Sequence, residues 1–178
     1  NYKFEHMEEK LNLWFDPVQL QKVIFNLLSN AFKYTKAKGS ITVSIRKIKN
    51  EVEIRVEDDG VGISKESIHK IFDRFYQVDG QSSEFTLGTG IGLAVSKGIV
   101  ELHKGNIRVE SEVGQGSVFI VTLLTGNEHF PKEVLSDSES NFHLIKDGVL
   151  EDLALEELML EEPVKEQELT NEEKAGEM

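Results

Sequence analysis

The sequence of 178 residues contains no cysteine and no apolar run long enough to cross a bilayer. The absence of cysteine excludes disulfide bonds and thiolate metal sites. A membrane-spanning helix needs about 18 or more consecutive apolar residues, and the sequence has no such run. No secretory signal pattern is visible at the N-terminus. The chain begins without methionine in the middle of a pattern, so we expect it to be cut from a longer protein.

The chain also lacks an excess of basic residues. Its 32 acidic and 20 basic residues give a formal net charge of -12. The acidity belongs to the C-terminal part, because residues 1–125 are neutral, whereas residues 126–178 carry sixteen acids and four bases. Neither part offers a basic surface for nucleic acid, and no nucleic-acid partner is expected.

Hydrophobic periodicity predicts one α/β domain over residues 1–125. In chain order we expect an edge strand within 1–15, a helix over 17–37, an antiparallel hairpin of strands 41–45 and 52–56, a short helix capped by Ser64 and carrying Ile68, Ile71 and Phe72, a helix ending near His103, and strands over 107–112 and 117–124. The last strand is apolar on both faces, which predicts an interior position in the sheet.

The first helix has a clear start signal at Asp16-Pro17. Asp is a favourable N-cap, and Pro fits the first helical position. Gln19 stands where the partner in a capping box would lie, so it is expected to bond back to the cap. The buried stripe is predicted from helical spacing and consists of Leu20, Val23, Ile24, Leu27, Leu28 and Ala31.

The composition changes after Thr125. Residues 126–146 lose periodicity, residues 148–162 are expected to form at most a marginal acidic helix, and residues 163–178 have a disordered composition. We treat 126–178 as an acidic linker or tail.

The most conspicuous stretch is Gly88-Thr-Gly-Ile-Gly-Leu-Ala94, with a glycine at every second position before a helical pattern. Backbone N–H groups without side chains around them, followed by the positive end of a helix, favour a phosphate ligand. A flexible turn before a helix is the alternative interpretation when the glycines are taken alone.

Asn26, Asn30 and Lys33 are spaced to share one face of the first helix. Amide oxygen, phosphate oxygens and waters form an adequate shell for Mg²⁺, and Lys33 would neutralise phosphate charge. The alternative is an ordinary solvent-facing polar stripe.

Asp58 and Gly60-x-Gly62 stand at the end of a predicted strand. A buried carboxylate there can accept a hydrogen bond from an exocyclic amine, while the glycines let a flat ring approach the backbone. An acidic turn is the alternative. Residues 73–88 show no period, which favours a lid or binding loop, and Gly114-x-Gly116-Ser117 alone indicates only a hairpin.

Together these motifs run in the order Asn-x-x-x-Asn-x-x-Lys, Asp-x-Gly-x-Gly, a Phe-rich lid, Gly-x-Gly-x-Gly-Leu and Gly-x-Gly-Ser-x-Phe. In this order the sequence resembles the ATP-binding catalytic domain of sensor histidine kinases, in the wider family of DNA gyrase, Hsp90 and MutL. No Rossmann fingerprint follows the first strand, and no Gly-Lys-Ser/Thr of a P-loop is present.

The resemblance implies a Bergerat-type fold, an α/β (α+β) two-layer sandwich. In such a fold a mixed, mostly antiparallel sheet is covered on one face by about three helices, with a mobile ATP lid. It implies ATP and Mg²⁺ as cofactors and Asn30 as the metal ligand. The nucleotide-binding residues carried over from the motifs are Asn26, Asn30, Lys33, Tyr34, Asp58, Gly60, Gly62, Ile63, Phe72, Arg74, Phe75, Gly88, Thr89, Gly90, Ile91, Gly92, Leu93 and Ser117.

Within this set the resemblance gives particular roles to a few residues. Asp58 would bind the adenine amino group, supported by Ser117 through water, and Tyr34 would lie beside the adenosine. Lys33 and Arg74 would neutralise phosphate charge, and Tyr76 completes the lid motif. The family often has a basic residue where Gln77 stands, which weakens the case for a lid contact to the γ-phosphate.

The implied activity is that of a protein-histidine kinase catalytic domain in a two-component phosphorelay. Hydrolysing members of the family place Glu where Asn26 stands, and an amide cannot take a proton, so little ATPase activity is expected. No catalytic acid or base is assigned in this chain. A hydrolysing, ATP-gated clamp or chaperone-like module, or a scaffold of the same fold, is the alternative.

None of the five histidines stands in a His-Glu sequence that opens a helix pair. The phosphoacceptor would therefore lie on an upstream dimerisation domain. The other implied partner is a response regulator or a fused receiver domain after the tail, the alternative being a solvated tail without a partner. We expect a cytoplasmic domain without membrane contact of its own, within a longer protein anchored in the inner membrane.

Overall fold

The structure, a computed structural model, describes residues 2–5, 13–78 and 89–135. Its elements are β1 (Tyr2–Glu5), α1 (Pro17–Tyr34), β2 (Ile41–Ile48), β3 (Glu51–Asp58), α2 (Lys65–Ile68), α3 (Gly92–Leu102), β4 (Asn106–Glu112), β5 (Gly116–Leu124) and the 3-10 turn η1 (Lys132–Val134). One five-stranded sheet has the order β1-β2-β3-β5-β4. The β1–β2 pair is parallel and the other pairs are antiparallel.

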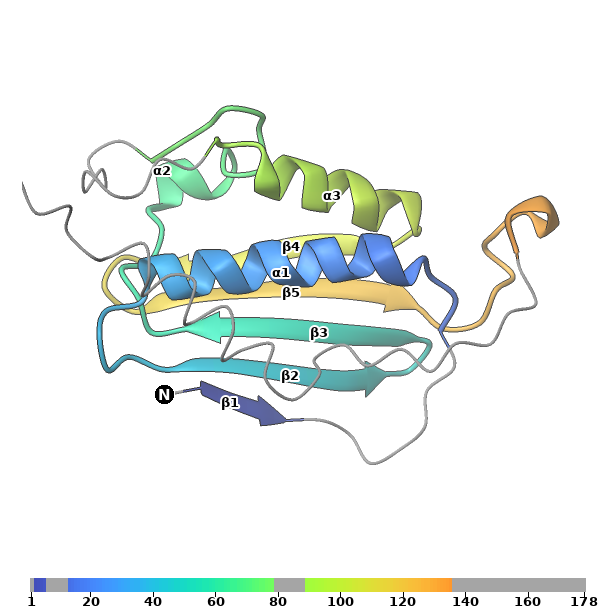
Figure 1. Cartoon of the computed structure of the whole chain (residues 1–178), viewed down its shortest axis with the longest axis horizontal. Helices are drawn as coiled ribbons and strands as arrows, with labels where there is room; N and C mark the ends of the chain where they lie inside the picture. The colour runs from blue at the N-terminus through green and yellow to red at the C-terminus, as the bar shows by residue number, and fades with distance from the viewer. Residues whose placement is uncertain (1, 6–12, 79–88, 136–178) are drawn as a thin grey trace, which may run out of the picture.

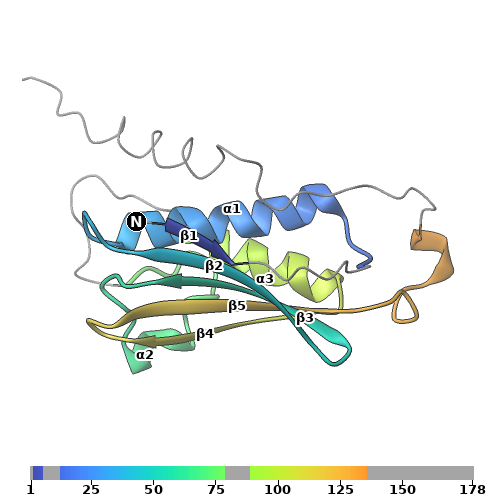
Figure 2. The same ribbon diagram turned by 90° about the horizontal axis from the view of Figure 1, so that it is seen from below.

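Helices α1 and α3 lie side by side on one face of the sheet, with α2 near the β4 edge (Figures 1 and 2). The predicted two-layer sandwich with a mixed, mostly antiparallel sheet is therefore confirmed. The interior position predicted for the last strand is also confirmed, because β5 lies between β3 and β4. No helix within the described ranges is both long and apolar enough to cross a membrane.

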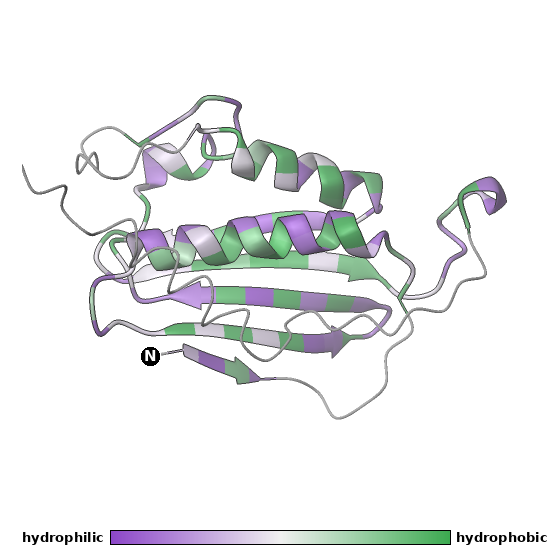
Figure 3. Cartoon of the chain, viewed as in Figure 1, coloured by the Kyte–Doolittle hydropathy of each residue, from purple (hydrophilic) through white to green (hydrophobic). Residues whose placement is uncertain are grey.

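The core lies between the α1–α3 layer and the sheet. Each residue of the predicted apolar stripe on α1 is buried, and so are alternate residues of β2 and β3. Figure 3 shows this pattern as apolar bands on α1 and alternating bands along the strands. The helical and strand periodicities of the sequence thus translate directly into the two layers of the fold.

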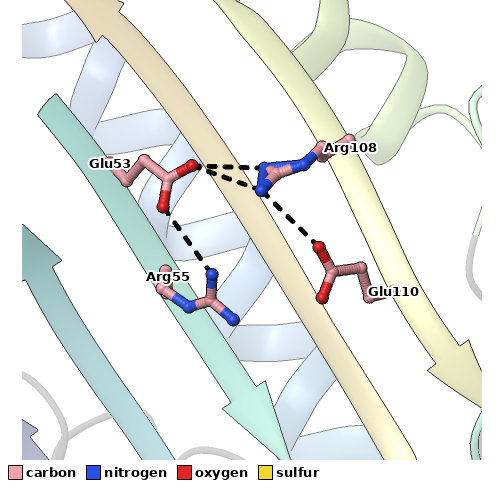
Figure 4. A network of polar contacts seen from close by, with 4 residues as sticks. All are labelled: Glu53, Arg55, Arg108 and Glu110. Atoms are coloured by element: carbon pink, nitrogen blue, oxygen red, sulfur yellow. Dashed lines mark hydrogen bonds and ion pairs between the residues drawn. The ribbon is translucent and has the colours of Figure 1, made fainter. Parts of the chain in front are cut away.

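The second face of the sheet carries a network of four charged side chains (Figure 4). The Glu53 carboxylate lies 3.2 Å from a guanidinium nitrogen of Arg108 and 3.6 Å from one of Arg55, and Arg108 lies 3.5 Å from Glu110. Ile120 on β5 stands between Arg55 and Arg108 in the strand register and is fully buried. Arginine stems can cover apolar surface while their heads stay in water, which explains an apolar residue on this face of β5.

The start of α1 is capped by Asp16, as predicted, since its carboxylate accepts the N–H groups of Val18 at 2.9 Å and Gln19 at 3.1 Å. The expected capping box is wrong. The Asp16 N–H donates instead to Nε2 of His103 at 2.9 Å, and Nδ1 of His103 lies 2.8 Å from the Ile99 carbonyl. His103 must therefore be neutral with its proton on Nδ1, and it joins the end of α3 to the start of α1.

Two predicted helices are shorter in the structure. Helix α1 ends at Tyr34 rather than 37, because the Tyr34 carbonyl accepts the N–H of Val61 and Thr35 is already extended. Helix α2 spans Lys65–Ile68 only, and turns continue to residue 75, with Ile71 buried. Of the edge strand expected within 1–15, the structure shows β1 and a single bridge at Leu13. The acidic helix expected over 148–162 lies outside the described residues.

The segment before α1 and the segment after β5 run side by side. Leu13 pairs with Gly126 in a parallel bridge, and Thr125 donates both its N–H and its hydroxyl to the Asn50 carbonyl. Phe130 then places its ring edge-on against His103, with 6.5 Å between the ring centroids. This corner lies at the opposite end of α1 from Tyr34 (Figure 1).

Candidate functional site

The predicted site residues gather at one end of the domain. The last residue of β3, Asp58, lies at the same end as the last turn of α1 and the first turn of α3 (Figure 1). The β4–β5 hairpin turns there as well, so Ser117 lies opposite Asp58 in the strand register. The topology therefore brings the described parts of the sequence motifs to one end of the domain. Residues 79–88, which include Gly88 and most of the loop predicted over 73–88, lie outside the described residues.

Asp58 is a buried carboxylate with backbone donors around it, and only 6% of its surface is exposed. Its Oδ1 accepts the Gly60 N–H at 2.9 Å. Burial raises the pKa of the Asp58 carboxyl above its ordinary value, an effect that the N–H groups of Gly60 and Ser117 oppose and that the nearby Asp59 and Glu57 reinforce. A buried acceptor held in this way can receive a hydrogen bond from an amine, as the sequence predicts.

The raised pKa of Asp58 predicts a pH dependence of stability. Between the ordinary pKa of 3.8 and the raised value, the folded protein keeps a proton that the unfolded chain has lost. The free energy of unfolding should therefore fall as the pH rises through this window, and Asp58→Asn should lack this part of the slope. Denaturant unfolding of both proteins from about pH 4 to about pH 7 measures the difference. If the free energy of unfolding depends on pH in the same way in both proteins, the raised pKa does not belong to Asp58.

The loop after Asp58 is packed tightly against α1 and β4. A Cβ on Gly60 would collide with the Tyr34 carbonyl, and one on Gly62 would collide with the Glu112 carbonyl. The N–H of Val61 bonds to Tyr34, and the carbonyl of Val61 accepts the N–H of Gly114 at 2.8 Å. The glycines are thus required by close backbone contacts within the protein, beyond the approach of a flat ring that the sequence suggested.

Ser111 on β4 links this loop to the β4–β5 hairpin, and the sequence analysis missed it. Its hydroxyl accepts the Ile63 N–H at 2.8 Å and donates to the Gly116 carbonyl at 2.7 Å, and it lies 3.0 Å from the Ser117 hydroxyl. The Ser117 hydroxyl is therefore the donor in that pair. The sequence did contain a signal for Ser111. It follows Ile107 and Val109 in the alternating pattern of β4, so its side chain is expected to face the core.

The polar face of α1 lies beside the start of α3. Asn26 and Asn30 are partly exposed, and Nδ2 of Asn26 donates to the Ser96 hydroxyl at 2.9 Å. Asn30 lies one turn farther along α1. The ammonium of Lys33 lies 5.1 Å from the ring centroid of Tyr34, which is within cation–π range.

The glycine run meets the lid motif at Phe75. The Phe75 N–H donates to the Gly90 carbonyl at 2.8 Å, and both residues have positive φ. Phe75 is 73% exposed, and Arg74 is also exposed. The Tyr76 hydroxyl bonds to the buried Ser67 at 3.1 Å, while Phe72 lies 6.0 Å below the Lys97 ammonium. Thr89 is exposed, and Ile91, Gly92 and Leu93 are partly buried.

A separate hollow of about 330 Å³ is lined by Asp58 and Ser117 together with residues of β4 and β5. Three further carboxylates, those of Glu57, Glu110 and Glu112, stand around it. It includes neither α1 nor the glycine run, and its acidic rim would repel a triphosphate. We therefore place the candidate nucleotide site on the α1–α3 side of Asp58.

A metal at this site would have few protein ligands. Within the described residues, no three His, Cys, Asp or Glu side chains come together as a metal-binding group. The amide oxygen of Asn30 fits Mg²⁺, a hard cation that usually keeps waters and binds through substrate phosphates. The donor set is thus compatible with a cation that arrives with its nucleotide.

Comparison with known proteins gives consistent matches. Residues 15–127 match the family model described as histidine kinase-, DNA gyrase B-, and HSP90-like ATPase. The chain is 40% identical over 140 residues to histidine kinase P4 of Formosa agariphila, covering 76% of this chain and 10% of that protein. It is 39% identical over 127 residues to the sensor protein kinase WalK of Staphylococcus aureus, covering 70% of this chain and 29% of that protein. The chain therefore spans less than a third of either relative.

Solved structures agree with the sequence matches. The nucleotide-free catalytic domain of histidine kinase ThkA superposes with a TM-score of 0.61 at 28% identity, covering 70% of this chain and 80% of that chain. Full-length ShkA in complex with AMPPNP superposes with a TM-score of 0.61 at 26% identity, covering 70% of this chain and 26% of that chain.

Proposed function

The chain belongs to the family of histidine kinase-, DNA gyrase B- and HSP90-like ATPases, and from this premise we propose that it binds ATP·Mg²⁺ and donates the γ-phosphoryl group to a histidine. The acceptor histidine would lie on a dimerisation domain of a longer sensor kinase. The observation that carries the proposal is the buried carboxylate of Asp58, at the same end of the domain as the polar face of α1 and the first turn of α3.

Each part of the site has a role in this proposal. Asp58 accepts a hydrogen bond from the adenine amino group, and the tightly packed loop over 60–63 forms one wall of the purine pocket. The positive end of α3 and the N–H groups of the preceding glycine run bind phosphate oxygens. Lys33 and Arg74 partly neutralise the charge of the phosphates. This chain therefore contributes to phosphoryl transfer by positioning the nucleotide and by electrostatic stabilisation. Mg²⁺, when bound, would supply positive charge to the phosphate groups, with Asn30 as its ligand from this chain.

The residue type and the contact of Asn26 support transfer of the phosphoryl group rather than hydrolysis of ATP. The amide occupies the place where hydrolysing family members have a glutamate, and its nitrogen is engaged by Ser96. An amide does not take a proton from water at neutral pH. AMPPNP in the ShkA structure lends further support to an ATP site, since that protein shares the fold of this chain.

The remaining proposals concern the longer protein. A response regulator, or a receiver domain after residues 126–178, would take the phosphoryl group from the histidine. Cytoplasmic location of this domain and membrane anchoring of the whole protein complete the proposed sensor.

The experiment is to titrate the chain with ATP and GTP analogues in Mg²⁺ by calorimetry and to measure ATP turnover. We expect one adenine nucleotide per chain and an affinity for the GTP analogue lower by at least roughly a hundredfold, because guanine places a carbonyl where Asp58 needs a donor. Turnover should be negligible until the phosphoacceptor domain is added, when acid-labile phosphohistidine should form. Rapid hydrolysis by the chain alone would favour the clamp alternative, and absence of binding would refute the proposal.

A further inference from the structure

Ser96 is a buried polar residue on the apolar face of α3. Only 1% of its surface is exposed, and the neighbouring positions on that face are Leu93, Ile99 and Val100, of which the last two are buried. Its hydroxyl accepts a hydrogen bond from Nδ2 of Asn26, a residue 70 positions earlier in the chain. Burying a hydroxyl that has no hydrogen-bond partner costs free energy. The hydrogen bond from Asn26 therefore explains how Ser96 can lie in the core.

The same amide also contacts the first residue of α3. A Cβ on Gly92 would collide with Oδ1 of Asn26, and its amide carbon and nitrogen are close to that position as well. The Asn26 side chain therefore fills the space left by the missing side chain of Gly92, while its nitrogen reaches Ser96 one turn along. Both ends of the amide are thus set by the first turn and a half of α3.

We propose that Ser96 is a positioning residue that holds the Asn26 amide and thereby fixes α1 against the start of α3. The inference rests on the proposed function, because it concerns the spacing between the two halves of the nucleotide site. Asn30 and Lys33 lie on α1, and the phosphate-binding glycine run leads into α3. Ser96 is too deeply buried to touch a nucleotide, so its influence passes through Asn26.

The role predicts a selective effect of Ser96→Ala. The variant leaves the Asn26 nitrogen without its acceptor, so the amide can rotate and the α1–α3 spacing is no longer fixed. Affinity for a Mg²⁺-bound, non-hydrolysable ATP analogue should fall roughly tenfold. Affinity for ADP in EDTA should change little, because that complex depends mainly on the purine pocket around Asp58. Ser44→Ala, which removes another buried hydroxyl from the sheet, is the matched control and should leave both affinities unchanged.

A double-mutant cycle with Asn26→Ala completes the test. If Ser96 acts through Asn26, the losses of triphosphate affinity in the two single variants should not add in the double variant. A lower melting temperature for Ser96→Ala with unchanged triphosphate affinity would show a purely structural hydroxyl and overturn the inference. Equal losses for both nucleotides, or additive losses in the cycle, would also overturn it. If the unmodified chain binds neither nucleotide, the proposed function itself fails.

Discussion

An Asp58→Asn variant is expected to lose ATP affinity by at least roughly a hundredfold while keeping its fold. The asparagine oxygen can still accept the Gly60 N–H, so the local turn survives. The second carboxylate oxygen becomes an amide nitrogen, which presents a donor to the donating adenine amine. Because burial already disfavours the ionised carboxylate, its removal should not lower the free energy of unfolding.

Asp59→Asn is the matched control for this prediction. Asp59 is adjacent and exposed, and its Oδ1 accepts the Ser40 N–H at 2.8 Å, a bond that asparagine can keep. Calorimetric titration with an ATP analogue should therefore show normal binding for Asp59→Asn and almost none for Asp58→Asn. Unchanged affinity in the Asp58 variant would remove the purine pocket from its proposed place.

An Asn30→Ala variant is expected to lose the part of nucleotide affinity that depends on Mg²⁺. Asn30 is the proposed amide ligand, and a bond to a charged partner contributes about 1.5 to 3 kcal/mol, so the loss in Mg²⁺ should be on the order of a hundredfold. In EDTA, the variant and the unmodified chain should bind ADP with similar affinity. Titration in the two buffers separates a metal ligand from a residue that merely supports the helix.

Ser29→Ala provides the comparison for Asn30→Ala. Ser29 is the preceding residue on α1 and is exposed, away from the shared polar face. The Ser29 variant should bind the Mg²⁺-bound analogue normally. An Asn30 variant that loses affinity equally in Mg²⁺ and in EDTA would argue against metal coordination by this amide.

Much of the fold could be predicted because its determinants are local. The Asp16 cap, the buried stripe of α1 and the β2–β3 hairpin follow from neighbouring residues, and the structure confirms them. The sequence also placed Asp58 at the end of a strand, and the structure confirms that position. The ligand contacts of the motif residues remain predictions.

The features that the sequence did not reveal depend on contacts between distant residues. Helix α1 ends early because Val61 takes the Tyr34 carbonyl, and the Gln19 capping box is replaced by His103 from the end of α3. Ser96 and Ser111 are similar cases, since a single serine on an apolar face does not identify its partner. No local propensity encodes such pairings, because they depend on which elements become neighbours.

The bridge between Leu13 and Gly126 joins the segment before α1 to the segment after β5 at the end of the sheet opposite Asp58. Strand β1 lies at the other end, because Tyr2 pairs with Ile41 and Ile41 pairs with Asp58. The short edge strand β1 therefore covers the backbone of β2 directly beside the candidate site. Displacing β1 would expose that part of β2 and leave the corner at Leu13 in place.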